Sequence, residues 1–157
     1  MARVQHPPPK KIALRDYAPA DFDALYDIDQ KVFETGVAYS RRQLREYLQL
    51  AGAQCILAEA GGKIAGFIVT AHEDRVGYIV TIDVLPASRR QSAGTLLLAE
   101  AERRLALGGV REIELETATD NASAVAFWRK HGYRTRGVIK NYYPNGRDAF
   151  SMTKTIE

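Results

Sequence analysis

Residues 84–98 read VLPASRRQSAGTLLL, a turn with two adjacent arginines and three small residues that leads directly into an apolar helix. Such a loop presents unpaired backbone N–H groups and positive charge at the start of a helix, which is a physical basis for binding a phosphate group. The alternative is an ordinary strand-to-helix connection in which Ser92 caps the helix. The rest of the chain has to decide between these interpretations.

The composition is that of one soluble globular domain. The chain has 157 residues, of which 46% are hydrophobic and 26% charged, a balance that disfavours disordered and membrane proteins. No apolar run approaches the roughly 20 residues that span a bilayer, and the first ten residues, MARVQHPPPK, lack the apolar centre of a signal peptide. We therefore expect a cytoplasmic protein with a flexible proline-rich tail over residues 1–10 and a single domain over residues 11–157.

Charge and cysteine content narrow the possible partners. The net charge of +3 and the pI near 9.0 are a mild excess that does not by itself indicate nucleic acid. Cys55 has no second cysteine to pair with, and the three histidines form no cluster with metal-ligand spacing. Cys55 lies in the apolar run CILAEA, so we interpret it as a small core residue. We expect no metal, no nucleic-acid partner and no membrane partner.

The pattern of apolar residues and turns predicts a mixed α/β sheet in the order β-α-α-β-β-β-α-β-α-β-β, with helices on both faces. Gly61 and Gly62 predict a tight hairpin turn, and Ser40 predicts a helix cap. Gly108–Gly109 and Gly132 predict helix ends. The predicted strands cover residues 11–17, 54–60, 63–72, 77–85, 111–117, 133–143 and 148–156, and the predicted helices cover residues 19–33, 40–50, 95–109 and 122–132.

With this order in place, the chain resembles the GNAT superfamily of N-acetyltransferases, which use acetyl-coenzyme A. The family's Arg/Gln-x-x-Gly-x-Gly/Ala loop reads Arg-Arg-Gln-Ser-Ala-Gly at residues 89–94, and a second block, TDNASAVAFWRKHGY, is similar to the family signature that follows downstream. The segment KNYYPNGRDAFSM resembles more narrowly the RimI-type enzymes, which acetylate protein N-terminal amines. The resemblance implies a GNAT-like acyl-CoA N-acyltransferase fold, with a central, mostly antiparallel sheet.

The resemblance also implies where acetyl-CoA binds. Backbone N–H groups from about Arg90 to Thr95 would receive the pyrophosphate, with the helix dipole and the arginines favouring its negative charge. The backbone of residues 82–84 would pair with the amides of the pantetheine arm as a neighbouring strand would, and Asn121 would hydrogen-bond the same arm. The full expected set is Ile82, Asp83, Val84, Arg89, Arg90, Gln91, Ser92, Ala93, Gly94, Thr95 and Asn121.

Two residues depart from the family pattern. Ser92 occupies the first glycine position, where its hydroxyl could donate to a phosphate oxygen or cap the helix. Trp128 stands where the family usually has a tyrosine that protonates the departing thiolate, and an indole N–H is not an acid near neutral pH. We interpret Trp128 as a packing residue, which leaves water, Tyr142, Tyr143 or no group at all as the acid.

Acetyl transfer requires a neutral amine, so a group must accept a proton from the ammonium. In the RimI-like alignment the base is a glutamate five residues before the asparagine, which is Glu116 here. Alternation in IELET puts Glu114 and Glu116 on one face. Asp83 is the alternative base, and both glutamates could simply face solvent. The catalytic expectation is Glu116 and Tyr143, and Tyr142 and Tyr143 would bind the acceptor, although two tyrosines beside a turn could merely pin a hairpin.

Three functions remain in competition. The first is an N-acetyltransferase, a monomer or homodimer, that acts on the α-amine of a peptide or protein N-terminus. The second uses the same acetyl-CoA and a small amine acceptor, because the segment FETGVAYSRR does not match the RimI-type pattern closely. The third is an acetyl-CoA-binding module without turnover, suggested by Ser92 and Trp128.

Overall fold

The computed structural model describes residues 11–89 and 92–157. The predicted proline-rich tail over residues 1–10 lies outside this range, as do Arg90 and Gln91. The elements, in chain order, are β1 (Ile12–Asp16), the 3-10 turn η1 (Pro19–Asp21), α1 (Phe22–Val32), α2 (Arg41–Leu48), β2 (Gln54–Ala60), β3 (Lys63–Glu73), β4 (Val76–Val84), α3 (Pro86–Arg89), α4 (Ala93–Leu107), β5 (Glu112–Ala118), α5 (Ala122–Lys130), β6 (Arg134–Ile139) and β7 (Ala149–Thr155).

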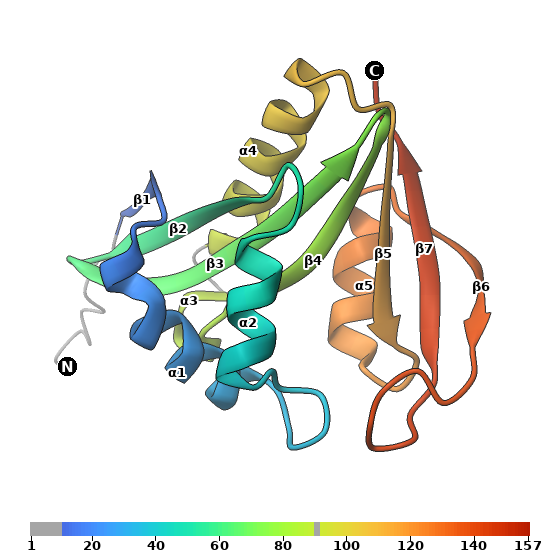
Figure 1. The fold of residues 1–157 in the computed structure, drawn as a ribbon, viewed down its shortest axis with the longest axis horizontal. Helices are drawn as coiled ribbons and strands as arrows, with labels where there is room; N and C mark the ends of the chain where they lie inside the picture. The colour runs from blue at the N-terminus through green and yellow to red at the C-terminus, as the bar shows by residue number, and fades with distance from the viewer. Residues whose placement is uncertain (1–10, 90–91) are drawn as a thin grey trace, which may run out of the picture.

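Seven strands of the described chain form one sheet in the order β1-β2-β3-β4-β5-β7-β6. Only the contact between β4 and β5 is parallel, and all other neighbours are antiparallel. Helices α1 and α2 cover one face of the sheet, and α4 and α5 cover the other (Figure 1). Apart from the short elements η1 and α3, the predicted order of elements is confirmed, as is the mostly antiparallel sheet with helices on both faces.

The core consists of two layers separated by the sheet. Successive residues of β3 alternate between them, since Phe67 and Val69 pack with Leu25 of α1, whereas Ile68 packs with Leu97 of α4. This alternation is the two-residue period of a strand, and burial on both faces explains why β3 reads as one apolar run. Cys55 packs at the edge of the α1 layer, as predicted, and burial raises the pKa of its thiol to about 12.

Several turn and cap residues play the structural roles that the sequence predicted for them. Gly61 and Gly62 both have positive φ, as the hairpin turn between β2 and β3 requires. The Ser40 hydroxyl accepts the backbone N–H of Gln43 and caps α2. Gly108 ends α4. None of the helices over residues 11–89 and 92–157 is both long and apolar enough to cross a membrane.

The local structure differs from the prediction at two places. The strand predicted over residues 133–143 ends at Ile139, because Asn141 takes a left-handed φ of 51° and its N–H donates to Asp148 at 2.9 Å instead of continuing the ladder. The two tyrosines that follow therefore belong to a loop. The single-turn helix α3, which begins at Pro86, was not predicted, because four residues carry no helical period.

The parallel ladder between β4 and β5 is short. Residues 76–78 pair with residues 112–114, and beyond this point the two strands separate (Figure 1). In the part of the chain that the structure describes, residues 79–84 of β4 pair only with β3. An inner strand thus presents one edge of unpaired backbone groups, to which a ligand can add like a further strand.

Gly66 of β3 is required by a close approach of backbone to β4. A Cβ atom at this position would lie 2.5 Å from the carbonyl oxygen of Asp83, a distance that forces the strands to move. We therefore expect Gly66→Ala to lower the free energy of unfolding by about 1–3 kcal/mol. Gly137→Ala is the matched control, because nothing lies within 4 Å of a Cβ there. Equal losses on thermal unfolding of both variants would contradict this prediction.

Candidate active site

A continuous cleft occupies the gap between the separating strands β4 and β5. It consists of two connected cavities of about 390 and 350 Å³. The larger one, which we call the tyrosine end, includes Tyr142 and Tyr143, and the smaller one, the helix end, includes the start of α4. Residues shared by the two cavities mark their junction: Val32, Phe33, Ile82, Asn121, Ala124 and Trp128.

The helix end contains most of the expected anion-binding loop that the structure describes. Arg89, Ser92, Gly94 and Thr95 line it together with Val84. Ser92 occupies the N-cap position of α4, as the alternative interpretation expected, but it has a left-handed φ of 63° and its hydroxyl makes no capping hydrogen bond. Among the residues that the structure describes, no side chain caps the first N–H groups of α4, which leaves them available to an anion. Arg90 and Gln91 lie outside the described residues.

Two members of the expected set do not line the cleft with their side chains. Ala93 is fully buried in the core beneath α4. Asp83 is also fully buried, and the Thr81 hydroxyl donates to its carboxylate at 2.5 Å. The alternative that Asp83 acts as the base is therefore wrong, because strand alternation points its carboxyl toward α1, away from the cleft.

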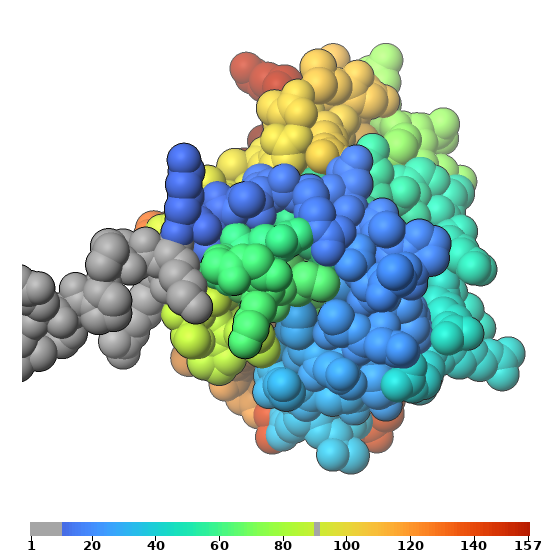
Figure 2. All heavy atoms as spheres, turned by 90° about the vertical axis from the view of Figure 1, so that its left-hand side faces the viewer, coloured from blue at the N-terminus to red at the C-terminus, as the bar shows by residue number. Residues whose placement is uncertain are grey.

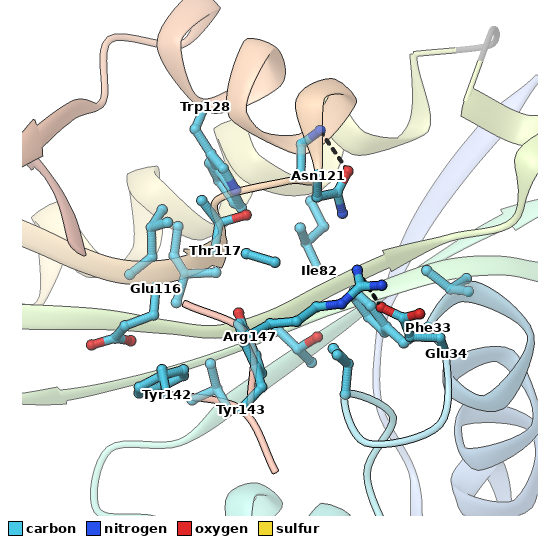
Figure 3. Close-up of a pocket in the computed structure, with 18 of the residues that line it drawn as sticks. Phe33, Glu34, Ile82, Glu116, Thr117, Asn121, Trp128, Tyr142, Tyr143 and Arg147 are labelled. Atoms are coloured by element: carbon cyan, nitrogen blue, oxygen red, sulfur yellow. Dashed lines mark hydrogen bonds and ion pairs between the residues drawn. The ribbon is translucent and has the colours of Figure 1, made fainter. Parts of the chain in front are cut away.

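Asn121 and Trp128 lie at the junction of the two cavities (Figure 3). The Asn121 side-chain oxygen accepts the backbone N–H of Ala124 at 3.2 Å and so caps α5. Its amide N–H groups make no hydrogen bond within residues 11–89 and 92–157, so they can donate to a ligand. Trp128 is 5% exposed and stacks edge-on against Phe127 and Tyr133, so its interpretation as a packing residue is confirmed.

The tyrosine end contains one carboxylate without a cationic partner. Glu114 and Glu116 share a face of β5, as alternation predicted, and Arg136 donates to Glu114 at 2.9 Å. Within residues 11–89 and 92–157, Glu116 has no ion pair. Desolvation, and secondarily the charge of Glu114, raises the pKa of the Glu116 carboxyl. A carboxylate with a raised pKa in a cleft is suited to accept a proton.

The two tyrosines of the β6–β7 loop stand beside this carboxylate. Tyr142 and Tyr143 stack edge-on with their ring centres 4.9 Å apart, and both line the cavity (Figure 3). Desolvation raises the pKa of both phenols, and nearby Glu116 adds to the effect in each. Both hydroxyls therefore keep their protons through neutral pH and are able to donate a hydrogen bond to a ligand.

Arg147 closes the tyrosine end in a way that the sequence did not indicate. Its guanidinium contacts Glu34 at 2.6 Å and Asp120 at 2.8 Å, which connects the α1–α2, β5–α5 and β6–β7 loops (Figure 3). Gly36 of the α1–α2 loop also lies against Asn145 of the β6–β7 loop. A Cβ atom added at Gly36 would lie only 2.7 Å from the Cβ atom of Asn145. Figure 2 shows the α1–α2 loop in light blue next to red atoms of the β6–β7 loop. No local motif joins these positions, because they are far apart in the chain.

The comparison with known families decides the identity of this site. The sequence profile of the Acetyltransferase (GNAT) family matches residues 22–133, which include β4, the start of α4, Glu116 and Asn121. The chain belongs to the GNAT family. It is therefore an acetyl-transferring enzyme, and the GNAT family uses acetyl-CoA.

GNAT relatives of known name resemble nearly the whole chain. The ribosomal protein bS18-alanine N-acetyltransferase of Escherichia coli is 30% identical over 142 residues, which cover 87% of this chain and 92% of the relative. An N-alpha-acetyltransferase of Sulfurisphaera tokodaii is 26% identical over 160 residues, covering 94% and 95%. The crystal structure of the E. coli ribosomal-protein-S18-alanine N-acetyltransferase superposes with a TM-score of 0.83 at 26% identity, covering 94% of this chain and 95% of that one.

Proposed function

We propose that this GNAT enzyme transfers the acetyl group of acetyl-CoA to the α-amine of a peptide or protein N-terminus by direct attack. The observation that carries the proposal is the two-ended cleft. An uncapped helix start with small residues forms one end, a carboxylate with two tyrosines forms the other, and the unpaired edge of β4 connects them. The names of the relatives support an N-terminal acceptor.

The helix end fits the diphosphate of acetyl-CoA. Free N–H groups in the first turn of α4 and the positive end of its dipole favour an anion, and Arg89 lines the same cavity. The pantetheine amides would then pair with the open edge of β4 near Ile82, and Asn121 would donate to the same arm. This arrangement directs the thioester toward the junction of the two cavities.

The tyrosine end supplies the acid–base chemistry. Glu116, directly or through a water molecule, takes a proton from the acceptor ammonium, and the neutral nitrogen attacks the thioester carbonyl carbon. A C–N bond forms, the C–S bond breaks, and the thiolate leaves. The nitrogen then releases its second proton as it becomes an amide, which balances the proton that the departing sulfur takes up to become the free thiol. Tyr143 is the residue we assign to donate a proton or hydrogen bond to that sulfur, because Trp128 cannot.

Release of free thiol from acetyl-CoA tests the proposal. The acceptors would be a panel of peptides varied at the first residue, the same peptides with blocked N-termini, and a set of small amines including polyamines and amino acids. We expect turnover with free peptide N-termini and none with blocked ones. Faster turnover with a small amine than with every peptide would contradict the peptide assignment.

The tyrosine pair should contribute to acceptor binding. Replacing Tyr142 or Tyr143 by Phe removes only a hydroxyl, and loss of one hydrogen bond to the peptide backbone should raise the KM for peptide about 2- to 10-fold in one of the variants. The KM for acetyl-CoA should stay nearly constant, which is the pattern of lost acceptor binding.

Steady-state kinetics with both substrates measures this split. Tyr78→Phe serves as control, because Tyr78 is an exposed tyrosine of β4 outside the cavities. If neither loop variant changes peptide kinetics, the tyrosines do not bind the acceptor.

A further inference from the structure

Two aspartates that the proposed chemistry does not use are buried against each other beneath the cleft. Asp29 lies in the last turn of α1, and Asp83 lies on β4 within the segment whose outer edge is open. Both residues are 0% exposed. Burying two carboxyl groups is costly unless their charge is removed and every oxygen has a partner, so the pair needs a physical explanation.

The hydrogen bonds around the pair leave one oxygen of each carboxyl group without a donor. The Thr81 hydroxyl donates to Oδ1 of Asp83 at 2.5 Å, and the Tyr39 backbone N–H donates to Oδ2 of Asp29 at 2.7 Å. Oδ1 of Asp29 and Oδ2 of Asp83 are buried and have no donor in the described part of the chain. The two carboxyl groups are within hydrogen-bonding reach of each other. A single proton between them would give all four oxygens a partner.

The surroundings favour the protonated form. Burial, and then the neighbouring Asp29, raises the pKa of Asp83 well above its usual range. The other titratable groups whose charges couple to Asp83 are Tyr39 from the α1–α2 loop and Cys55 from β2, and both are acids. Within the described residues, no cation contributes to the raised pKa of Asp83. One proton on two carboxyl groups leaves one negative charge instead of two.

Tyr39 links the aspartate pair to the tyrosine end of the cleft. The Tyr39 N–H is held by Asp29, its carbonyl accepts from the Gln30 side chain at 2.7 Å, and its hydroxyl donates to the Val80 carbonyl at 3.1 Å. Val80 is the extra residue of a bulge in β4, since Val69 pairs with Thr81 and Thr70 pairs with Ile79. Tyr39 itself and three other residues of its loop line the tyrosine end: Phe33, Glu34 and Val37.

We infer that Asp29 and Asp83 share one proton and act as positioning residues that fix the α1–α2 loop against β4 in the geometry that binds the acceptor. Neither carboxyl group reaches the cleft, so neither side chain touches a substrate. The acceptor part of this inference rests on the proposed function, whereas the shared proton and the anchoring of Tyr39 do not.

The sign of the pH dependence follows from the raised pKa of Asp83. A group whose pKa is higher in the folded than in the unfolded state contributes stability that is complete below the unfolded value and is lost as pH rises through the folded value. Removing the proton leaves two anions in contact, so Asp29 is pushed away from its partner and the Tyr39 anchor weakens. We expect a higher acceptor KM at alkaline pH.

The test compares Asp83→Asn with Asp83→Ala. The asparagine amide can donate to Asp29 as the protonated carboxyl does, so Asp83→Asn should keep the acceptor KM within about twofold and abolish the alkaline rise. Asp83→Ala leaves a buried, unpaired Asp29, and the acceptor KM should rise about tenfold, with the KM for acetyl-CoA nearly constant. Asp27→Ala, an exposed aspartate of the same helix, is the control.

Two readouts need no acceptor. Hydrogen exchange at the Tyr39 amide should be slow in the wild type and in Asp83→Asn, and faster in Asp83→Ala. Infrared spectroscopy of the wild type at neutral pH should show the carbonyl band of a protonated carboxyl, which Asp83→Asn removes. This second readout also decides the matter if Asp83→Ala does not fold.

Each contrary result would disprove one specific part of the inference or of the proposed function. A missing band, or a band that persists in Asp83→Asn, disproves the shared proton at this site. Unchanged exchange at Tyr39 in a folded Asp83→Ala disproves the anchor. A normal band and normal exchange in an enzyme that acetylates no peptide would contradict the proposed function alone, and equal changes in both KM values would disprove the positioning role.

Discussion

Glu116→Gln should lower turnover at neutral pH by about 100- to 10,000-fold, the usual contribution of a general base. Glutamine has nearly the same shape but cannot accept the ammonium proton, so acetyl-CoA affinity should change little. Because partial desolvation and the charge of Glu114 raise the pKa of Glu116, the wild-type rate should fall as pH decreases through that raised value. In the variant this limb should disappear, and the rate should recover partly at high pH, where more of the acceptor amine is already neutral.

Glu114→Gln is the matched control for this prediction. Glu114 lies on the same face of the same strand, but its carboxylate is paired with Arg136. Removing the charge of Glu114 should keep turnover within a few-fold of the wild-type value. It should also lower the pKa of Glu116, which shifts the acidic limb of the pH–rate profile to lower pH. If Glu116→Gln instead behaves like the wild type over the whole pH range, solvent takes the proton, because Asp83 is buried away from the cleft.

Gly94→Ile should weaken the binding of coenzyme A roughly 100-fold, which corresponds to about 2.7 kcal/mol. Gly94 lies in the first turn of α4 and lines the helix end of the cleft. A branched side chain there would extend beside Phe127 and Val84 into the space that the diphosphate and pantetheine require. Isothermal titration with coenzyme A measures the loss, and it does not depend on the identity of the acceptor.

Two controls separate this effect from misfolding. A Cβ at position 94 would lie 3.4 Å from Phe127, an ordinary contact, so Gly94→Ala should fold normally and lose much less affinity. Leu107→Ile introduces the same side chain at an exposed position near the other end of α4. Wild-type affinity in a folded Gly94→Ile would mean that the diphosphate does not approach this turn.

Local signals were sufficient for most of the fold. The period of two in IELET placed Glu114 and Glu116 on one face because a strand that is half buried allows no other arrangement. The double glycine and the Ser40 cap succeeded for the same reason, since a turn or a cap is determined by a few adjacent residues. The loop that we propose binds acetyl-CoA could be recognised in the sequence because its small residues and arginines are contiguous.

Features that depend on distant residues could not be predicted. Arg147 meets Glu34 and Asp120 only after the two ends of the sheet are assembled. The strand after α5 was predicted too long because Asn141 bonds to a side chain seven residues away. Asp83 was considered as a base, since its sequence position is compatible with the cleft, and only the packing of Asp29 against it reveals that its carboxyl points elsewhere.

The short ladder between residues 76–78 and 112–114 makes this sheet two half-sheets, β1–β4 and β5–β7–β6. In the described chain, main-chain pairing between the halves is confined to that ladder and the turn beside it. A substrate that runs along β4 and also contacts Asn121 joins the halves where they are least connected. Binding of such a ligand to the folded state raises the free energy of unfolding, by about 2.7 kcal/mol at a ligand concentration of 100 times Kd. The concentration of the acetyl donor would then affect both the rate of this enzyme and the fraction of it that is folded.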